Sequence, residues 1–236
     1  PARSIKERKR LIEIEKTIIP DIIYTMSGPA YVDFYNTHLL GFSDANLIVK
    51  NEWDKTFLEK TEDFLLGLYK MHFFKKADYW IFQTEVSRKG FIEKTNVPED
   101  KTFVVLNSCG RNYCDFKELN NMDEPSEVLR ILVPAADFSS KNLKIIPYVA
   151  QELKKRISDR KISKTFKFIL TLPFNSKGWK GIDAKSKELG VDDMIFNNGP
   201  FSVADGPNLY KNSFLVFFPT LLETFSGVFV ESMATG

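Results

Sequence analysis

The sequence has few of the residues that build disulfide frameworks, metal centres or strongly charged surfaces. Its 236 residues include two cysteines and two histidines, and 33 Lys and Arg residues nearly balance 31 Asp and Glu residues. Cys109 and Cys114 lie five positions apart, with no Cys-x-x-Cys pair and no neighbouring histidine, which argues against a disulfide framework and a zinc site. A formal charge of +2 excludes a strong global field for nucleic acid or an anionic membrane. A reducing, cytosolic compartment fits best.

Long hydrophobic segments are also missing. The longest apolar runs, such as 214–219, fall far short of the roughly 18–20 residues that a membrane span needs, and no signal-peptide core opens the chain. The composition is nevertheless 43% hydrophobic and 14% aromatic, enough for one large domain or two smaller ones. The chain starts at Pro1 and stops at Gly236, and neither end resembles a natural terminus.

Short apolar runs alternate with amphipathic stretches in the first half of the chain, a pattern that predicts an α/β domain. The expected helices cover 3–17, about 55–76 and 85–94, and the expected strands cover 21–26, 46–49, 79–83 and 102–106. The second helix carries apolar residues at helical spacing, which we assign to the core: Phe57, Phe64, Leu65, Leu68 and Met71.

A polar stretch rich in turn formers, about 110–127, predicts a linker and a domain boundary between 124 and 125. The α/β rhythm then restarts, with strands expected at 128–134, 166–172, 194–197 and 214–218, and helices at about 141–157, 180–188, 205–211 and from Ser226 onward. Such alternation predicts two α/β domains with parallel, Rossmann-like sheets, one in 1–124 and one in 125–236.

The most informative segment runs from Pro219 to the end of the chain. The loop after strand 214–218 carries Glu223, and it lies at the carboxyl end of a parallel strand, where open α/β sheets bind ligands. The N–H groups of Ser226, Gly227 and Val228 open the following helix and can cradle a phosphate. Glu231 lies inside that helix. Carboxylates on either side of an anion site suit a nucleotide-sugar, although a helix-end charge and a buried salt bridge would also account for two glutamates.

The seven residues between Glu223 and Glu231 give a spacing that resembles the Glu-x7-Glu signature of retaining glycosyltransferases of family 4, which have the GT-B fold. Further stretches resemble the family's other motifs: Asn198-Gly-Pro-Phe-Ser, Leu209-Tyr-Lys-Asn-Ser, Pro219-Thr and Pro134-Ala-Ala-Asp-Phe-Ser-Ser-Lys-Asn-Leu. The bacterial members that assemble O-antigen or capsule are the most similar. Because family members are longer, we expect both Rossmann-like domains to be incomplete here and this piece alone to be inactive.

The resemblance implies a role for individual residues. Glu223 would contact the transferred sugar, Glu231 would hold the nucleotide ribose, and Lys141 would pair with the donor diphosphate. The remaining residues assigned to donor binding are Thr224, Phe225, Ser226, Gly227 and Val228. A lysine at this place does the job that a metal does in other transferases, so no metal and no cofactor beyond the nucleotide-sugar co-substrate is expected. Many members have an arginine shortly before this lysine, whereas this chain has Ala135-Ala-Asp-Phe-Ser-Ser140.

The first domain offers weaker signals. His38 lies in a His-x-x-Gly-Phe stretch that resembles one in the family's acceptor-side domain, and its imidazole could hydrogen-bond the donor sugar or the acceptor; a structural histidine is an equal alternative. Gly28 and Pro29 follow strand 21–26 and are candidates for the cleft, or form a plain glycine turn. His72 is assigned to packing or to the surface.

The resemblance implies a metal-independent, retaining glycosyltransferase that moves a sugar from a nucleotide-diphosphate donor to a saccharide or lipid-linked acceptor in bacterial surface-polysaccharide synthesis. No nucleic-acid partner is expected, and the expected location is cytoplasmic, with peripheral contact to the inner face of the membrane. Two alternatives stay open. One is a non-catalytic nucleotide-binding domain of a polysaccharide assembly complex, and the other is a different enzyme on the same scaffold, such as a nucleotide-sugar epimerase or a phosphorylase-like enzyme.

Overall fold

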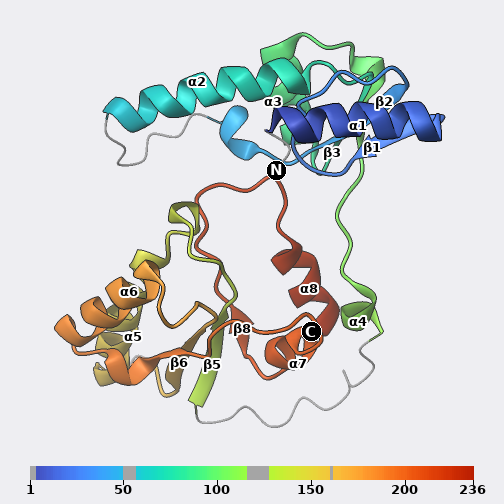
Figure 1. Ribbon diagram of the computed structural model, residues 1–236. Helices are drawn as coiled ribbons and strands as arrows, with labels where there is room; N and C mark the ends of the chain where they lie inside the picture. The colour runs from blue at the N-terminus through green and yellow to red at the C-terminus, as the bar shows by residue number, and fades with distance from the viewer. Residues whose placement is uncertain (1–3, 50–56, 116–127, 160–161) are drawn as a thin grey trace. The chain divides into compact units, whose positions relative to one another are not determined.

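The computed structural model describes residues 4–49, 57–115, 128–159 and 162–236. The chain divides into two compact units, residues 1–107 (unit 1) and 108–236 (unit 2). Each unit is built around a four-stranded sheet whose described strands are all parallel (Figure 1). The α/β class and the two parallel sheets are therefore as the sequence predicts.

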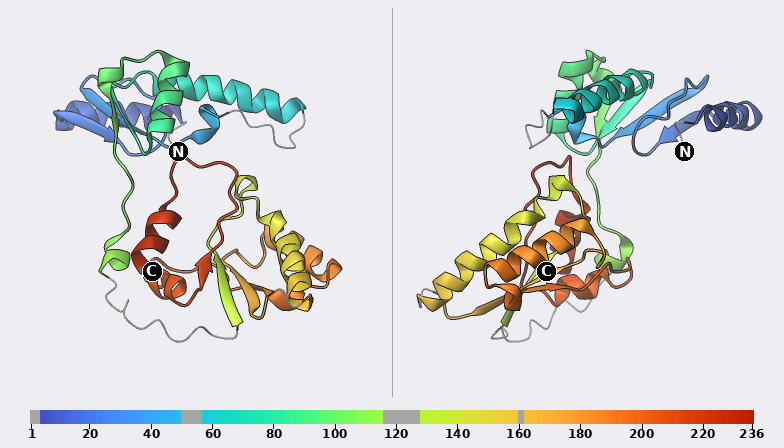
Figure 2. Two further views of the ribbon diagram at one scale, coloured as in Figure 1. Left: turned by 180° about the vertical axis from the view of Figure 1, so that it is seen from behind. Right: turned by 60° about the vertical axis from the view of Figure 1, so that its left-hand side comes forward.

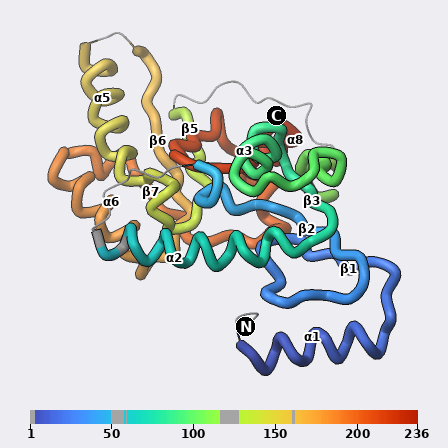
Figure 3. The backbone as a smooth tube through the Cα atoms, turned by 90° about the horizontal axis from the view of Figure 1, so that it is seen from above, coloured from blue at the N-terminus to red at the C-terminus, as the bar shows by residue number. Residues whose placement is uncertain are grey.

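Unit 1 contains, in chain order, α1 (Ile5–Ile18), β1 (Ile22–Thr25), β2 (Thr37–Phe42), the 3-10 turn η1 (Ala45–Leu47), α2 (Phe57–Phe74), β3 (Tyr79–Phe82), α3 (Glu85–Thr95), η2 (Glu99–Lys101) and β4 (Thr102–Val104). The strand order is β1-β2-β3-β4, so each described strand pairs with the next one along the chain. Figure 3 shows α1 on the β1 side of this unit and α3 on the β3 side.

Aromatic side chains fill the core of unit 1. Phe42, Phe82 and Phe91 bring one ring each from β2, β3 and α3, and the Phe42 ring lies 4.9 Å from the Phe91 ring and 5.6 Å from the Phe82 ring. Phe74, from the end of α2, contacts the same cluster at 4.9 Å from Phe42. Such ring pairs pack strands and helices together by area burial and edge-to-face attraction.

The second strand of unit 1 is not where the apolar pattern places it. Residues 46–49 form no strand, because Ala45–Leu47 is a 3-10 turn, and the strand is instead β2, Thr37–Phe42. Gly41 permits the close approach of this strand to the end of β1, because a Cβ at Gly41 would collide with the backbone oxygen of Met26.

The apolar residues along α2 are also placed differently from the prediction. Phe64, Leu65 and Leu68 are exposed, whereas Met71 packs against the core at the end of the helix. The Phe57 side chain lies outside the described residues. The helix reaches the core of unit 1 with its last turn, so most of its apolar face stays uncovered within this unit. The assignment of His72 to packing or surface is confirmed, since His72 is exposed and its ring contacts Phe73.

Unit 2 contains α4 (Arg111–Cys114), β5 (Val128–Val133), the 3-10 turns η3 (Ser139–Lys141) and η4 (Leu143–Ile145), α5 (Ile146–Ser158), β6 (Thr165–Leu170), α6 (Lys177–Glu188), η5 (Asp192–Met194), β7 (Ile195–Asn197), α7 (Gly206–Lys211), β8 (Leu215–Val216) and α8 (Gly227–Thr235). The strand order is β7-β6-β5-β8. The chain therefore steps from β5 outward to β6 and β7, and then returns to the other side of β5.

Helices cover both faces of the sheet in unit 2. Figure 2 shows α5 and α6 on one side of the strands and α7 and α8 on the other. Successive side chains of β5 point to opposite faces of the sheet and contribute to both hydrophobic clusters. Ile131 and Val133 belong to the cluster under α5 and α6, whereas Leu132 belongs to the cluster under α7 and α8. A strand buried on both faces has apolar residues at successive positions, as β5 has from Ile131 to Val133, and this run is why the sequence places β5 correctly.

The helix expected from residue 141 begins at Ile146, after two 3-10 turns, and the strand expected at 214–218 contains only Leu215 and Val216. Lys141 therefore ends the turn η3 rather than opening a helix. Both differences lengthen the loops that follow β5 and β8.

Cys109 and Cys114 form a disulfide, contrary to the expectation from their spacing. The single helical turn of α4 brings the two Cα atoms to 6.4 Å, within the range that a disulfide spans. The turn packs with α7 and α8, so unit 2 starts at Ser108. The predicted boundary between 124 and 125 falls among residues outside the described ones.

Candidate functional site

The chain reverses its direction across the sheet between β5 and β8 of unit 2. In open parallel sheets, the loops after the two strands that flank such a reversal splay apart at the carboxyl edge and leave room for a ligand. The loop after β5 carries Lys141, and the loop after β8 carries Glu223. The strand order thus places two of the predicted residues at the position where a ligand is expected.

Lys141 and Glu223 meet across this reversal. Lys141 Nζ donates a hydrogen bond to Glu223 Oε1, and the side chains are 18% and 24% exposed. Partial burial strengthens a charge pair relative to the surface, while the remaining exposure leaves both groups accessible. Lys141 Nζ also lies 4.9 Å from the centroid of the Phe218 ring, a cation–π distance.

Backbone contacts hold the two loops together beside this pair. The Leu221 N–H donates to the Ser140 carbonyl oxygen at 2.8 Å, and Thr220 Oγ1 donates to the same oxygen at 3.2 Å. Thr220 Oγ1 is also 3.5 Å from Glu223 Oε1. The positions of the ammonium and the carboxylate are therefore set by their neighbours in the chain as well as by their mutual attraction.

The loop after β5 is tied to α6 by Asp137. Its Oδ2 accepts a hydrogen bond from the Gly178 N–H at 2.8 Å, in the first turn of α6, where a carboxylate is favoured by the helix dipole. A Cβ at Gly178 would collide with the Asp137 carboxylate, so a larger residue there would displace this side chain. Asp137 thus connects the loop that carries Lys141 to the first turn of α6.

The N-terminus of α8 follows Glu223 closely in the chain. Ser226 is its N-cap, and Ser226 Oγ accepts a hydrogen bond from the Val228 N–H at 3.4 Å. The Val228 N–H is thus engaged by the cap, and its place in the anion cradle stays a prediction. Of the three predicted N–H groups, those of Ser226 and Gly227 are the ones that the cap does not use.

Thr224 and Phe225 connect Glu223 to this helix. The Phe225 ring lies 6.3 Å from the ring of Phe229 in an edge-to-face arrangement, and Phe218 contacts Phe229 in the same way at 5.5 Å. These aromatic contacts join the loop to the first turn of α8. Phe225 thus contributes to packing around the loop, and its predicted contact with a donor stays a prediction, as does that of Thr224.

Glu231 lies one turn inside α8 and is held by a tyrosine that the sequence analysis does not single out. Tyr210 Oη donates to Glu231 Oε2 at 2.9 Å. Glu231 Oε1 lies on the side of Gly227, 3.5 Å from where a Cβ of that glycine would be. The carboxylate therefore spans the space between Tyr210 on α7 and the first turn of α8. In the sequence, Leu209-Tyr210 belongs to a stretch with a motif resemblance, which does not by itself indicate this bond.

Two tyrosine hydroxyls stay protonated around Glu231. Burial raises the pKa of Tyr210 far above its ordinary value of 10.0, and the charge of Glu231 and the hydrogen bond to it raise that pKa further. Burial raises the pKa of Tyr113 as well, again with a contribution from Glu231. The raised pKa keeps the Tyr210 hydroxyl protonated, so that it donates to Glu231 Oε2.

His38 lies in unit 1, in the interior of β2, and is 3% exposed. Its Nε2 is 2.7 Å from Thr25 Oγ1, and its ring lies edge-on to Phe34 with the centroids 5.0 Å apart. Burial lowers its pKa below 6.5, against the smaller opposing influence of Asp78 and Glu15, so the ring is neutral. These contacts fit the structural alternative for His38; the catalytic assignment stays a prediction.

Gly28 and Pro29 follow β1, as predicted. Gly28 has a φ of +75°, a left-handed conformation that glycine adopts without strain, and no other atom lies within 4 Å of where its Cβ would be. Pro29 is buried within unit 1. The geometry is that of the plain glycine turn, and a place in a cleft stays a prediction.

The described residues offer neither a cluster that could hold a metal ion nor a helix that could span a membrane. Their His, Cys, Asp and Glu side chains form no group of three or more suited to holding a metal ion. Likewise, none of the helices in the described ranges has the length and apolar character needed to cross a membrane.

The two α/β units with parallel sheets match the GT-B class of fold, which solved glycosyltransferase structures share. The full chain is similar to a glycosyltransferase from Rickettsia africae ESF-5, with a TM-score of 0.67 and 20% identity, over 98% of this chain and 60% of that one. It is also similar to an E. coli trehalose-6-phosphate structure bound with UDP-2-fluoro glucose (TM-score 0.67, 12% identity, 98% and 60% covered). The α,α-trehalose-phosphate synthase (UDP-forming) of Burkholderia xenovorans, in complex with glucose-6-phosphate, is similar with a TM-score of 0.70 and 8% identity over 98% and 60%.

At these identities the similarity establishes the fold. No protein-family model and no curated protein matches the sequence. The chain spans about 60% of the length of the three structures.

Proposed function

We propose that unit 2 carries the donor site of a retaining glycosyltransferase, which moves a sugar from a nucleotide-diphosphate donor to a hydroxyl group of an acceptor. The observation that carries this proposal is the Lys141–Glu223 pair, which joins the two loops at the strand-order reversal between β5 and β8. A cation and a carboxylate at this edge, next to the N-terminus of α8, provide one group for a diphosphate and one for sugar hydroxyls.

The proposed donor pose follows from the chemistry of each group. Lys141 leaves Glu223 to pair with the diphosphate, assisted by the N–H groups at the start of α8. Glu223 accepts hydrogen bonds from the sugar, and Glu231 accepts them from the ribose hydroxyls. The Lys141–Glu223 bond thus keeps the two groups in place until the donor, which offers a counter-charge to Lys141 and hydroxyls to Glu223, takes over both interactions.

The proposed reaction is a same-face displacement. The bond between the anomeric carbon and the diphosphate oxygen breaks as the acceptor oxygen bonds to that carbon, and the acceptor proton moves to the departing diphosphate. Lys141 neutralises the charge that develops on the leaving group, which is why the proposal needs no metal ion. Glu223 orients the donor and forms no covalent intermediate.

Two of the similar structures support the classes of substrate. The E. coli structure holds UDP-2-fluoro glucose, a nucleotide-sugar, and the Burkholderia xenovorans structure holds glucose-6-phosphate. We therefore propose a nucleotide-sugar donor and a saccharide or lipid-linked acceptor. The place in bacterial surface-polysaccharide synthesis rests on the resemblance of the Glu-x7-Glu segment.

A thermal-shift screen of the intact chain tests the proposal. Since a ligand that binds only the folded state raises the melting temperature, we expect one of UDP, GDP, ADP and CDP to raise it by several degrees at about 100 times its dissociation constant. Inorganic phosphate at the same concentration serves as the control for non-specific anion binding. If none of the four diphosphates raises the melting temperature more than phosphate does, the proposed donor site is wrong.

Two glutamate variants separate the parts of the site. Glu231→Ala should weaken binding of the selected nucleoside diphosphate about tenfold, because the ribose loses its acceptor. Glu223→Ala should leave that affinity nearly unchanged and remove the extra affinity that the sugar of the nucleotide-sugar provides. Glu188→Ala, in an exposed ion pair with Lys185, is the matched control. If both variants lose the same affinity for the nucleoside diphosphate and for the nucleotide-sugar, the two glutamates do not have separate roles.

A further inference from the structure

A buried pair of tyrosines lies behind Glu231 in unit 2. Tyr210 and Tyr113 are 4% and 3% exposed, and their rings are 5.7 Å apart and nearly perpendicular, at 86°. Both belong to the core cluster between the sheet and the helices α7 and α8. The Tyr210 hydroxyl, which donates to Glu231, is thus attached to a ring whose position is set by packing.

The bond from Tyr210 decides which way the Glu231 carboxylate faces. Tyr210 binds Oε2, and this leaves Oε1 on the side of Gly227, the first residue of α8. A glutamate side chain has several rotatable bonds and loses considerable entropy when it is fixed. A donor from a rigid, buried ring reduces the entropy that the side chain must lose when a ligand binds, because the carboxylate is already oriented.

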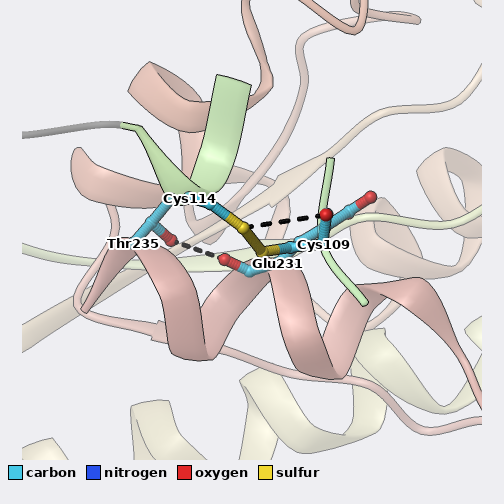
Figure 4. The surroundings of a disulfide bond; sticks show 4 residues. All are labelled: Cys109, Cys114, Glu231 and Thr235. Carbon is cyan, nitrogen blue, oxygen red and sulfur yellow. Dashed lines mark hydrogen bonds between the residues drawn. A yellow bond between two sulfur atoms is a disulfide. The ribbon is translucent and has the colours of Figure 1, made fainter. Parts of the chain in front are cut away.

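A short disulfide-closed turn holds Tyr113 in this pair. Tyr113 lies in α4, between Cys109 and Cys114, and the disulfide closes the turn on both sides of it. Figure 4 shows that the disulfide lies beside the part of α8 that contains Glu231 and Thr235, where Thr235 Oγ1 donates to the Glu231 carbonyl oxygen at 3.0 Å. The disulfide therefore lies beside the helix that carries Glu231.

The space around Tyr113 is filled on its other side by α7. A Cβ at Gly206, the first residue of α7, would collide with the Tyr113 hydroxyl. Gly206 is buried, so the helix that carries Tyr210 and the turn that carries Tyr113 approach each other as closely as backbone permits. A displacement of the turn therefore reaches Tyr210 through direct contact.

We propose that Tyr210 is a positioning residue for Glu231, and that the turn closed by Cys109 and Cys114 supports it, so that nucleotide affinity depends on the redox state of this disulfide. The proposal rests on the proposed function, because it concerns the same carboxylate. Reduction by a dithiol is a two-electron exchange: the two cysteines each take up a proton and become thiols, and the dithiol becomes a cyclic disulfide. The freed turn then holds Tyr113, and through it Tyr210, less firmly.

The first test compares two forms of one ligand on Tyr210→Phe. The probes are the tightest binder among UDP, GDP, ADP and CDP and its 2′,3′-dideoxy form, titrated by calorimetry. Since Glu231 acts on the ribose hydroxyls, Tyr210→Phe should weaken the ribose form about tenfold and leave the dideoxy form unchanged. A purely structural role would weaken both forms equally, and that result would overturn the proposal. Tyr148→Phe removes an exposed tyrosine hydroxyl from α5 and is the matched control.

The second test needs no variant in the tyrosine pair. Dithiothreitol should weaken binding of the ribose form to the wild-type chain by a few fold, less than Tyr210→Phe does, because the bond to Glu231 is loosened rather than removed. It should not affect the Cys109→Ser/Cys114→Ser double variant, which should bind like the reduced wild type. Equal affinity in the oxidised and reduced wild type would overturn the part assigned to the turn.

The outcomes separate this proposal from the proposed function. If none of the four diphosphates binds the wild type, both fail together. If one binds, and the ribose and dideoxy forms respond equally to Tyr210→Phe, the donor site stands and the positioning role is wrong. If Tyr210→Phe does not fold, as judged by circular dichroism, the dithiothreitol measurement on the ribose and dideoxy forms decides the question in the wild-type chain.

Discussion

The two sheets of this protein are built from the same kinds of strand and helix but differ in strand order. In unit 1 the described strands follow one another, β1-β2-β3-β4, whereas in unit 2 the order β7-β6-β5-β8 reverses beside β5. Only the second arrangement makes neighbouring loops diverge at the carboxyl edge. The candidate site lies at this reversal, so the order of the strands, more than their composition, determines where the chemistry is placed.

The polar side chains of the two units also differ in what they bind. In unit 1, Glu15 Oε1 accepts hydrogen bonds from the backbone N–H groups of Tyr35 and Asn36, and Asp78 Oδ2 accepts from the N–H of His38. In unit 2, Lys141 and Glu223 are bound mainly to each other and remain partly exposed. Side chains that satisfy buried backbone serve the fold, and partly exposed side chains that pair across two loops are available to a ligand.

The largest effect expected in this comparison is the loss of stability in Glu15→Ala. Glu15 is 4% exposed, and its removal leaves two N–H groups, at 2.6 and 2.8 Å from Oε1, without their acceptor. We expect the free energy of unfolding to fall by about 3 kcal/mol, with nucleotide affinity unchanged. Urea unfolding followed by tryptophan fluorescence measures this. Glu13→Ala, on the exposed side of α1, is the control, and an equal effect of both variants would contradict the structural role.

The next effect concerns unit 2. The Cys109→Ser/Cys114→Ser variant opens a loop of a few residues, and loss of the constraint on the unfolded chain should cost about 2 kcal/mol. The same urea titration, on wild type with and without dithiothreitol, measures it. The reduced wild type should behave like the double variant. An unchanged midpoint after reduction would show that the disulfide does not stabilise the unit.

The smallest effect is the pH dependence of stability that His38 contributes. Burial lowers its pKa below 6.5, so the unfolded chain binds more protons than the folded chain between the two pKa values. The stability that the buried, neutral His38 contributes is fully present above pH 6.5. It declines as the pH falls below that value and is lost below the pKa of the folded state. Replacement of His38 by Gln should reduce the change of the urea midpoint with pH across this interval, and replacement of the exposed His72 should leave that change as it is. A steeper decline without His38 would contradict the buried, neutral ring.

The sequence predicts most of the fold, because both sheets use patterns that local chemistry determines. The run Val128–Val133 is apolar apart from Arg130, and a helix begins directly after Ser226, close to where it is expected. The strand β2 was missed because its central position depends on Gly41 and on the backbone oxygen of Met26, a contact far apart in the chain. The disulfide was missed for a similar reason, since the turn between Cys109 and Cys114 is what brings them together.

The candidate site was predicted in part. Spacing and resemblance identified Glu223, Glu231 and Lys141, but they did not indicate that Lys141 binds Glu223 or that Tyr210 binds Glu231. Both bonds join residues that come from different strand–helix units, and their existence depends on the order β7-β6-β5-β8. Periodicity along the chain contains no information about that order.

The central claim is that Lys141, at the reversal between β5 and β8, binds the diphosphate of a nucleotide donor. Calorimetric titration of Lys141→Ala with the selected nucleoside diphosphate tests it most directly, with Lys167→Ala as the control, because Lys167 also lies over an aromatic ring, 4.7 Å from that of Phe196, but within β6. We expect Lys141→Ala to weaken binding by about ten- to a hundredfold and Lys167→Ala to leave it unchanged. Equal affinities in the two variants would contradict the claim.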